Sequence, residues 1–205
     1  MTKLTKYLLL TLAFVAVPLL SSGQTPEDDN YETAEQNIAN PPVPPKASAS
    51  IIRHMDGLAK TLGRHNFDVR KTRKGEVLRV IITSDRLFDS NATSLKTSAK
   101  PILNAFEALV KRPELYKLVI LGHTDDTGDE IYSDNLSEVR ANAVDEFFED
   151  MVPGSQCNVI PYGMGYDEPL NPNDSIENRR KNRRIEIYII PTQTLIDVAR
   201  KGKLT

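Results

Sequence analysis

The 205-residue sequence contains no tryptophan and a single cysteine, Cys157. An intramolecular disulfide is therefore excluded, although disulfides are common in exported domains. Cys157 lies in the β-like segment 156–160. We expect a small buried thiol there, because free cysteine is among the most buried residue types.

Signatures of catalysis and of metal binding are also missing. The three histidines are scattered and lack a spacing such as H-E-x-x-H, and no G-x-S-x-G motif supplies a serine nucleophile. The acidic residues of segment 125–130 do not match the alternating pattern of a calcium-binding loop. We therefore predict that the protein is not an enzyme and that it carries no metal and no cofactor.

The charges nearly balance, and one apolar run stands at the N-terminus. The formal net charge is −2 at pH 7, which gives no strongly basic surface for nucleic acid. Lys3 and Lys6 precede the apolar segment 7–20, and small residues follow it, in the order of a secretory signal peptide. The segment is shorter than the roughly 18 residues expected of a membrane span. We predict a signal peptide over residues 1–23 and a periplasmic location; an uncleaved anchor and outer-membrane association are the alternatives.

Composition divides the remainder into four parts. Residues 24–46 are acidic and proline-rich, with too little apolar content for a core, and predict a disordered tether. Residues 47–76 are predicted to form an N-terminal helix and the first strand. The main domain is expected over residues 77–191, and residues 192–205 form a C-terminal tail with a candidate helix.

Apolar residues at helical spacing predict three longer helices, at about 48–63, 95–110 and 135–151. Asn135 is the expected cap of the third helix, with Glu138 three residues later. The stripe that this helix is expected to bury consists of Leu136, Val139, Ala143, Phe147 and Met151.

Strands are predicted at five segments, of which the first two are joined by a hairpin at Lys74-Gly75. The continuous apolar run at 118–121 is typical of a strand buried on both faces, whereas 185–189 alternates like a half-buried strand. Helices and strands alternate through the middle, which favours parallel pairing through helical crossovers. The fold class is α/β, an α+β sandwich with a mixed sheet. The predicted strands are 67–71, 77–83, 118–121, 159–162 and 185–189.

The segment Gly122–Gly128, with the sequence GHTDDTG, follows the apolar strand and leads into the third helix. Asp125 therefore lies beyond the carboxyl end of a strand, where ligands bind in open α/β sheets. Arg140 falls along the edge of the helix's apolar stripe, where an arginine without a partner is rare. A carboxylate and a guanidinium at one mouth could hold a ligand that carries both an amine and a carboxylate. The alternatives are that Asp125 stabilises a turn, or that Arg140 pairs with Asp125 or Asp89.

Two further segments bear on this site. Asp89 and Asn91 follow the second strand and could face the same crevice, although Asn91 also suits a turn. The basic run Arg179–Arg184 suits a solvated surface, and some of its arginines could anchor loops through carbonyls and carboxylates.

Five motifs in order closely resemble the OmpA-like C-terminal domain, which also occurs in the peptidoglycan-associated lipoprotein and in MotB. The resemblance covers about residues 77–190, and the combination of motifs makes it specific. The motifs are Phe88-Asp89-x-Asn91 with Leu95, Gly122-His123-Thr124-Asp125-x-x-Gly128, Leu136-Ser137-x-x-Arg140-Ala141, Gly163-x-Gly165, and Asn182-Arg183-Arg184 with Ile185.

The resemblance implies a βαβαββ fold with helices on one face of the sheet, and noncovalent binding of peptidoglycan. It assigns the grip on the diaminopimelate of the stem peptide to Asp125 and Arg140. Ser133 stands where the family commonly carries asparagine, and the shorter side chain implies weaker binding. The positions that the resemblance adds to the pocket lining are Asp89, Asn91, Thr124, Thr127 and Arg183.

A second hypothesis is that the protein is an envelope assembly or interaction subunit. In that case the helix at 48–63 and the proline-rich tether would recruit another envelope protein, and wall binding would be secondary.

Overall fold

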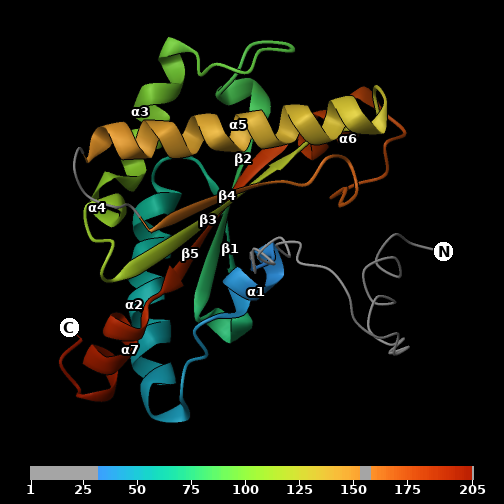
Figure 1. Cartoon of the computed structure of the whole chain (residues 1–205). Helices are drawn as coiled ribbons and strands as arrows, with labels where there is room; N and C mark the ends of the chain where they lie inside the picture. The colour runs from blue at the N-terminus through green and yellow to red at the C-terminus, as the bar shows by residue number, and fades with distance from the viewer. Residues whose placement is uncertain (1–31, 153–157, 205) are drawn as a thin grey trace, which may run out of the picture. The chain divides into compact units, whose positions relative to one another are not determined.

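A five-stranded mixed sheet forms the centre of the structure (Figure 1). The computed structural model describes residues 32–152 and 158–204. The predicted signal peptide and Cys157 lie outside the described residues. Within them, no helix combines the length and the apolar character that crossing a membrane requires.

The strand order across the sheet is β1-β2-β5-β3-β4. Only β3 and β4 pair in parallel among these strands, whereas β1 with β2, β2 with β5, and β5 with β3 are antiparallel. The expectation of parallel pairing through the middle is therefore wrong for β5, which inserts between β2 and β3. The strands are β1 (Asp68–Thr72), β2 (Val77–Thr83), β3 (Tyr116–His123), β4 (Val159–Gly163) and β5 (Arg184–Pro191).

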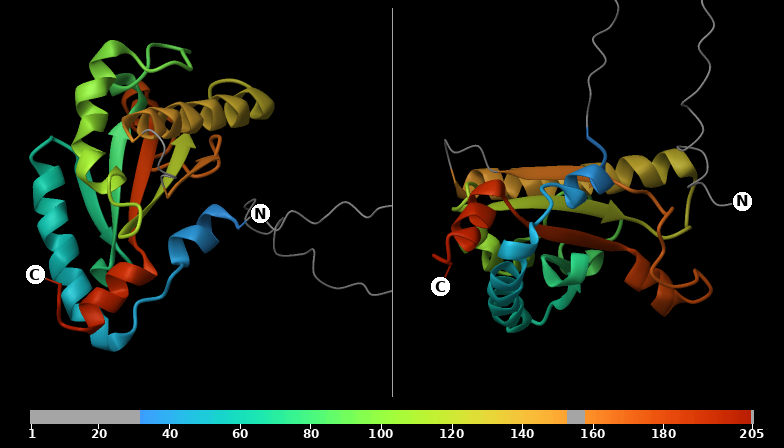
Figure 2. Two further views of the ribbon diagram at one scale, coloured as in Figure 1. Left: turned by 60° about the vertical axis from the view of Figure 1, so that its left-hand side comes forward. Right: turned by 90° about the horizontal axis from the view of Figure 1, so that it is seen from below.

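The helices α2 to α5 and α7 pack on one face of the sheet, as their shared core residues show. α7 lies beside α2 (Figures 1 and 2). The predicted second helix is a nearly continuous stretch of two α-helices and two 3-10 turns. The helices are α2 (Pro45–Gly63), α3 (Lys100–Leu103), α4 (Glu107–Val110), α5 (Glu130–Met151), α6 (Ile176–Asn182) and α7 (Gln193–Arg200), and the 3-10 turns are η2 (Arg73–Gly75), η3 (Ser84–Arg86), η4 (Thr97–Ala99) and η5 (Asn104–Phe106).

β5 is the central strand, and every residue from Arg184 to Pro191 is buried. The prediction of a half-buried strand was wrong because β5 is covered on both sides. Ile185, Ile187 and Ile189 join the core beneath the helices, while Tyr188 and Ile190 face a smaller cluster on the opposite side.

That opposite side is covered in part by α1 (Ala34–Ala39), a short helix within the segment expected to be a disordered tether. Long-range hydrogen bonds hold it although it has little apolar surface. The Asn37 amide donates to the Tyr162 hydroxyl at 2.8 Å, and the Arg73 guanidinium donates to the carbonyls of Ile38 and Pro41 at 2.9 and 2.8 Å. Residues 32–46 thus depart from the predicted tether.

α5 differs from its prediction in both its start and its buried face. Asp129 caps it by accepting a hydrogen bond from the Tyr132 backbone N–H at 2.8 Å, so that the helix begins five residues before Asn135. Val139 of the predicted stripe is 38% exposed. The residues that α5 buries are Ser133, Ser137, Arg140, Ala141, Val144 and Phe148.

Candidate ligand-binding site

Two glycines let α5 approach the sheet closely at the end that carries the motifs. A Cβ atom at Gly122 would lie 2.1 Å from the Ser137 carbonyl oxygen, and one at Gly163 would lie 2.7 Å from the Glu138 nitrogen. Side chains at either position would therefore push the helix away. The close approach explains why small polar residues, rather than large apolar ones, line the buried face of the first turns of α5.

Asp125 lies two residues beyond β3 and is 4% exposed. One carboxylate oxygen accepts the Thr127 backbone N–H at 2.9 Å, and the other pairs with the Arg183 guanidinium. Burial alone would raise the pKa of the Asp125 carboxyl, but the hydrogen bonds from Thr127 and Arg183 and the Arg183 charge lower it below its ordinary value. Asp125 is therefore ionised at neutral pH.

Three arginines of the basic run anchor α6 to neighbouring loops. The sequence left such anchoring open as an alternative to a solvated surface. Arg179 pairs with Asp126 at 2.9 Å, Arg180 pairs with Asp85 at 2.7 Å, and Arg183 pairs with Asp125. Because Arg183 follows α6 and precedes β5, these pairs fix the chain at the point where the central strand begins.

Arg140 reaches the site from the buried face of α5. Its Nε donates to the Ala92 carbonyl at 2.9 Å, and its guanidinium carbon lies 5.0 Å from the centroid of the Phe88 ring, a cation–π arrangement. Burial lowers the pKa of Arg140, Tyr132 opposes this shift, and Arg183 adds to it. The guanidinium remains charged, because arginine is not deprotonated in proteins.

Arg183 therefore acts electrostatically on both residues of the predicted clamp, since its charge affects the pKa values of Asp125 and of Arg140. The direct ion pair between Arg140 and Asp125, which the sequence left open, is replaced in the structure by the pair between Arg183 and Asp125. We call Asp125, Arg140 and Arg183 the open cluster. Its formal charge is one positive unit, which favours the approach of an anionic group.

Buried hydroxyl groups without hydrogen-bond partners accompany the open cluster. Thr124 and Ser133 are 6% and 1% exposed, and neither hydroxyl has a partner in the described part of the chain. The buried hydroxyl of Ser137, by contrast, has two partners: it donates to the Asp134 carbonyl and accepts the Gly165 N–H. A buried polar group normally has a hydrogen-bond partner, so the hydroxyls of Thr124 and Ser133 are among the exceptions in the described part of the chain.

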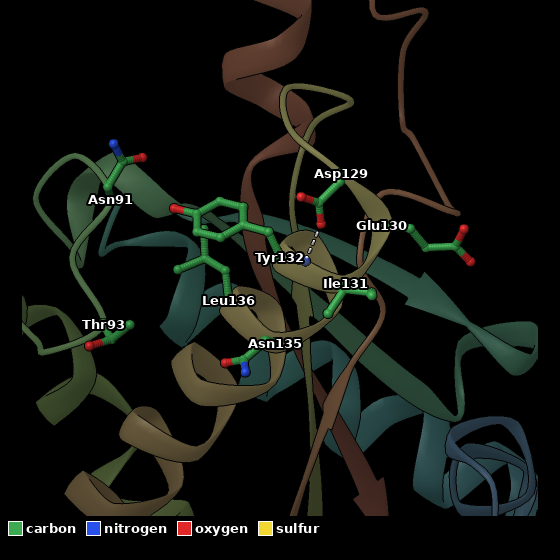
Figure 3. Close-up of a pocket in the computed structure, with 8 residues that line it drawn as sticks. All are labelled: Asn91, Thr93, Asp129, Glu130, Ile131, Tyr132, Asn135 and Leu136. Carbon is green, nitrogen blue, oxygen red and sulfur yellow. Dashed lines mark hydrogen bonds between the residues drawn. The ribbon is translucent and has the colours of Figure 1, made fainter.

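Figure 3 shows a groove of about 740 Å³, which adjoins the open cluster because Arg140 bonds the Ala92 carbonyl on one of its walls. Asn91, at a positive φ of 56° in an exposed turn, faces it across from Tyr132. Asp89 is exposed, and its backbone carbonyl accepts the Ala92 N–H. Asp89 does not line this groove.

The structure thus brings most of the predicted site residues to one end of the sheet. Asp125, Thr127 and Arg183 are in direct contact, and Arg140 lies within electrostatic range of Arg183. Sequence reasoning missed Tyr132, because α5 was expected to begin after it; Asp129 as an N-cap was the signal that could have found it. In the described residues, no group of three or more His, Cys, Asp or Glu side chains could hold a metal ion.

Comparisons with known proteins agree with the resemblance. A family model described as the OmpA family matches residues 87–183. The chain is 30% identical over 113 residues to outer membrane protein A of Bordetella avium, covering 55% of this chain and 57% of that protein. It is 31% identical over 113 residues to the outer-membrane lipoprotein YfiB of Pseudomonas aeruginosa, covering 55% of this chain and 66% of that protein. The chain thus spans less than two thirds of the length of these relatives.

The fold has a counterpart among solved structures. A protein from Desulfovibrio vulgaris described as MotB-like superposes with a TM-score of 0.58 at 24% identity, covering 71% of this chain and 93% of that chain. This likeness supports the fold alone, a mixed five-stranded sheet with helices packed on it.

Proposed function

Because the chain carries an OmpA-family domain over residues 87–183, we propose that it binds peptidoglycan noncovalently in the periplasm by gripping the diaminopimelate of the stem peptide. OmpA-family domains typically bind peptidoglycan in the cell envelope, and such domains are non-enzymatic. The curated relatives include outer-membrane proteins and lipoproteins. We propose that the protein is exported by its N-terminal signal peptide.

The observation that carries the proposal is the ion pair between Asp125 and Arg183 with Arg140 close by. Diaminopimelate ends its side chain in an amine and a carboxylate. The amine would replace Arg183 on the Asp125 carboxylate, and the released guanidinium would join Arg140 in holding the ligand carboxylate. One internal ion pair is thereby exchanged for charge-assisted contacts with both ends of the zwitterion.

The free hydroxyls support the same ligand. Thr124 and Ser133 each offer a buried hydroxyl that can donate to a carboxylate or accept from an ammonium group. Binding would satisfy groups that are otherwise left without partners, and unsatisfied buried groups cost about 1–3 kcal/mol each.

Sedimentation with purified sacculi tests the proposal. We expect Asp125→Ala and Arg140→Ala each to weaken binding by about 2–5 kcal/mol, because each leaves a ligand charge without its partner. Asp68→Ala and Arg70→Ala are matched controls, since these two residues form a half-exposed pair on β1 and should leave sedimentation unchanged. Circular dichroism checks that each variant is folded, and retention of binding by both folded site variants would overturn the site assignment.

The rival hypothesis of an assembly subunit receives less support from α2. Its apolar residues Ala47, Ile51, Met55 and Leu62 are at most 2% exposed and belong to the main core. The helix that was expected to recruit a partner already uses its apolar face within the chain.

A further inference from the structure

The groove beside the open cluster continues along α5. A second hollow of about 480 Å³ shares Thr93 with the first, and both have α5 as one wall and the 91–95 segment as the other. Leu136 lines the first hollow and Val139 the second, and residues three apart are neighbours on a helix surface. From Tyr132 to Asp150 the helix rises about 27 Å at about 1.5 Å per residue. The combined groove is therefore long enough for an extended polymer.

Apolar and amide groups alternate on the walls of this groove. Ile131, Tyr132 and Val139 are 82%, 45% and 38% exposed, which makes them three of the four large apolar residues that the described surface exposes. Asn91, Asn135 and Asn142 present side-chain amides along the same walls. Such a surface suits rings that have apolar faces and polar edges, because side chains like tyrosine pack against the face while amides bind the edge.

The charges in the groove select against anions. Among the described residues that line it there are four carboxylates, Asp129, Glu130, Glu146 and Asp150, and no lysine or arginine. Burial, followed by the charges of Glu149 and Glu146, raises the pKa of Asp145 on the same stretch of α5 to about 6. An acidic polymer or the carboxylates of a stem peptide would be repelled here, whereas a neutral chain would not.

We propose that this groove binds the neutral glycan backbone of peptidoglycan through its N-acetylated sugar rings, a proposal that rests on the function proposed above. The groove borders the stem-peptide site directly, because Arg140 holds the Ala92 carbonyl between Asn91 and Thr93. A strand lying in the groove would therefore place a stem peptide near Asp125. The positively charged open cluster would bind the stem peptide, and the acidic groove would bind the neutral glycan of the same polymer.

Titration of the full chain with tetra-N-acetylchitotetraose, a neutral N-acetylated sugar chain without peptide, tests the proposal. We expect wild-type binding, with chemical-shift changes at Thr93, Asn135 and Asn142. Asn135→Ala should weaken this binding about tenfold, the net worth of one hydrogen bond at its upper end, and Ile131→Ala should weaken it about tenfold through the loss of apolar contact with a sugar ring. Ile176→Ala is the matched control, because Ile176 is 84% exposed on α6 and does not line the groove.

A parallel titration with a diaminopimelate-containing stem tetrapeptide separates the two proposals. Normal tetrapeptide binding without sugar binding would overturn the groove assignment and leave the proposed function standing. Sugar binding that the groove variants and the Ile176 control weaken equally would also overturn it. Failure of the wild-type protein to bind the tetrapeptide would count against the proposed function instead.

Discussion

Arg183 and Arg184 are consecutive in the chain, yet they belong to two contrasting charge clusters at the point where β5 begins. Arg184 donates to Glu186 at 2.6 Å and to the carbonyls of Asn182 and Glu168 at 3.1 and 2.9 Å. Both side chains of its ion pair are 2% exposed. The Arg183 side chain is 39% exposed, and its bond to Asp125 is the contact that a ligand can replace.

Two adjacent residues where β5 begins thus have different roles, one in stability and one in the proposed binding site. We call Arg79, His123, Arg184, Glu186 and Tyr188 the sealed cluster; its carboxylate is shared among Arg184, Tyr188 and, at 3.6 Å, Arg79. The Arg184–Glu186 pair within the sealed cluster is closed to solvent and bonded internally, whereas the Arg183–Asp125 pair of the open cluster includes a partly solvated arginine.

The largest difference between the clusters is expected in stability. Arg184→Ala removes the main partner of a buried carboxylate and should lower the free energy of unfolding by about 3–5 kcal/mol. Arg183→Ala breaks a partly exposed pair and should cost about 1 kcal/mol or less. Urea denaturation measures both, and equal losses would contradict the distinction between a sealed and an open cluster.

The sealed cluster also predicts a pH dependence through His123. Burial, followed by the charges of Arg184 and Arg79, lowers the pKa of His123 well below its ordinary value. The unfolded chain therefore takes up a proton near pH 6.5 that the folded protein does not. Stability should fall below about pH 6.5 by about 1.4 kcal/mol per pH unit.

A His123→Leu variant isolates this effect, because leucine cannot take up the proton. The difference in unfolding free energy between wild type and variant should change between pH 7.5 and pH 5.5, in favour of the variant at the lower pH. A constant difference would show that His123 titrates normally in the folded protein.

A smaller effect of the opposite sign is expected at Asp145 on α5. The raised pKa of Asp145, about 6, means that the ionised carboxylate destabilises the folded protein above that pH. Asp145→Asn should raise the free energy of unfolding at pH 7.5 by about 1 kcal/mol, a figure reduced for solvent screening. The gain should disappear below about pH 4, and a gain that persists at that pH would point to another cause.

The sequence predicted where the helices and strands lie better than which side chains of each element are buried. All five strands and the helices at 48–63 and 135–151 were expected, because apolar periodicity is strong there. The buried face of α5 was misjudged, since Gly122 and Gly163 admit the helix so closely that Ser133 and Ser137 fit where larger apolar residues would not. Hydrophobic pattern alone cannot report a contact between backbones.

The sequence identified the residues of the candidate site but not which of them form ion pairs with one another. Motifs identified Asp125, Arg140 and Arg183, yet the partner of Asp125 depends on how α6 meets the loop after β3. The position of α1 was unpredictable for a similar reason. Its attachment depends on Arg73 and Tyr162, which are distant in sequence and leave no local signal.

The central claim is that the open cluster binds an amine and a carboxylate together. Calorimetric titration with two stem tetrapeptides, one containing diaminopimelate and one containing lysine at the same position, tests it most directly, because the lysine side chain keeps the amine and lacks the carboxylate. We expect the diaminopimelate peptide to bind more tightly by about 2 kcal/mol or more, the cost of leaving a charged partner unpaired, and Asp125→Ala to abolish binding of both peptides. Equal affinity of the wild-type protein for the two peptides would contradict the account.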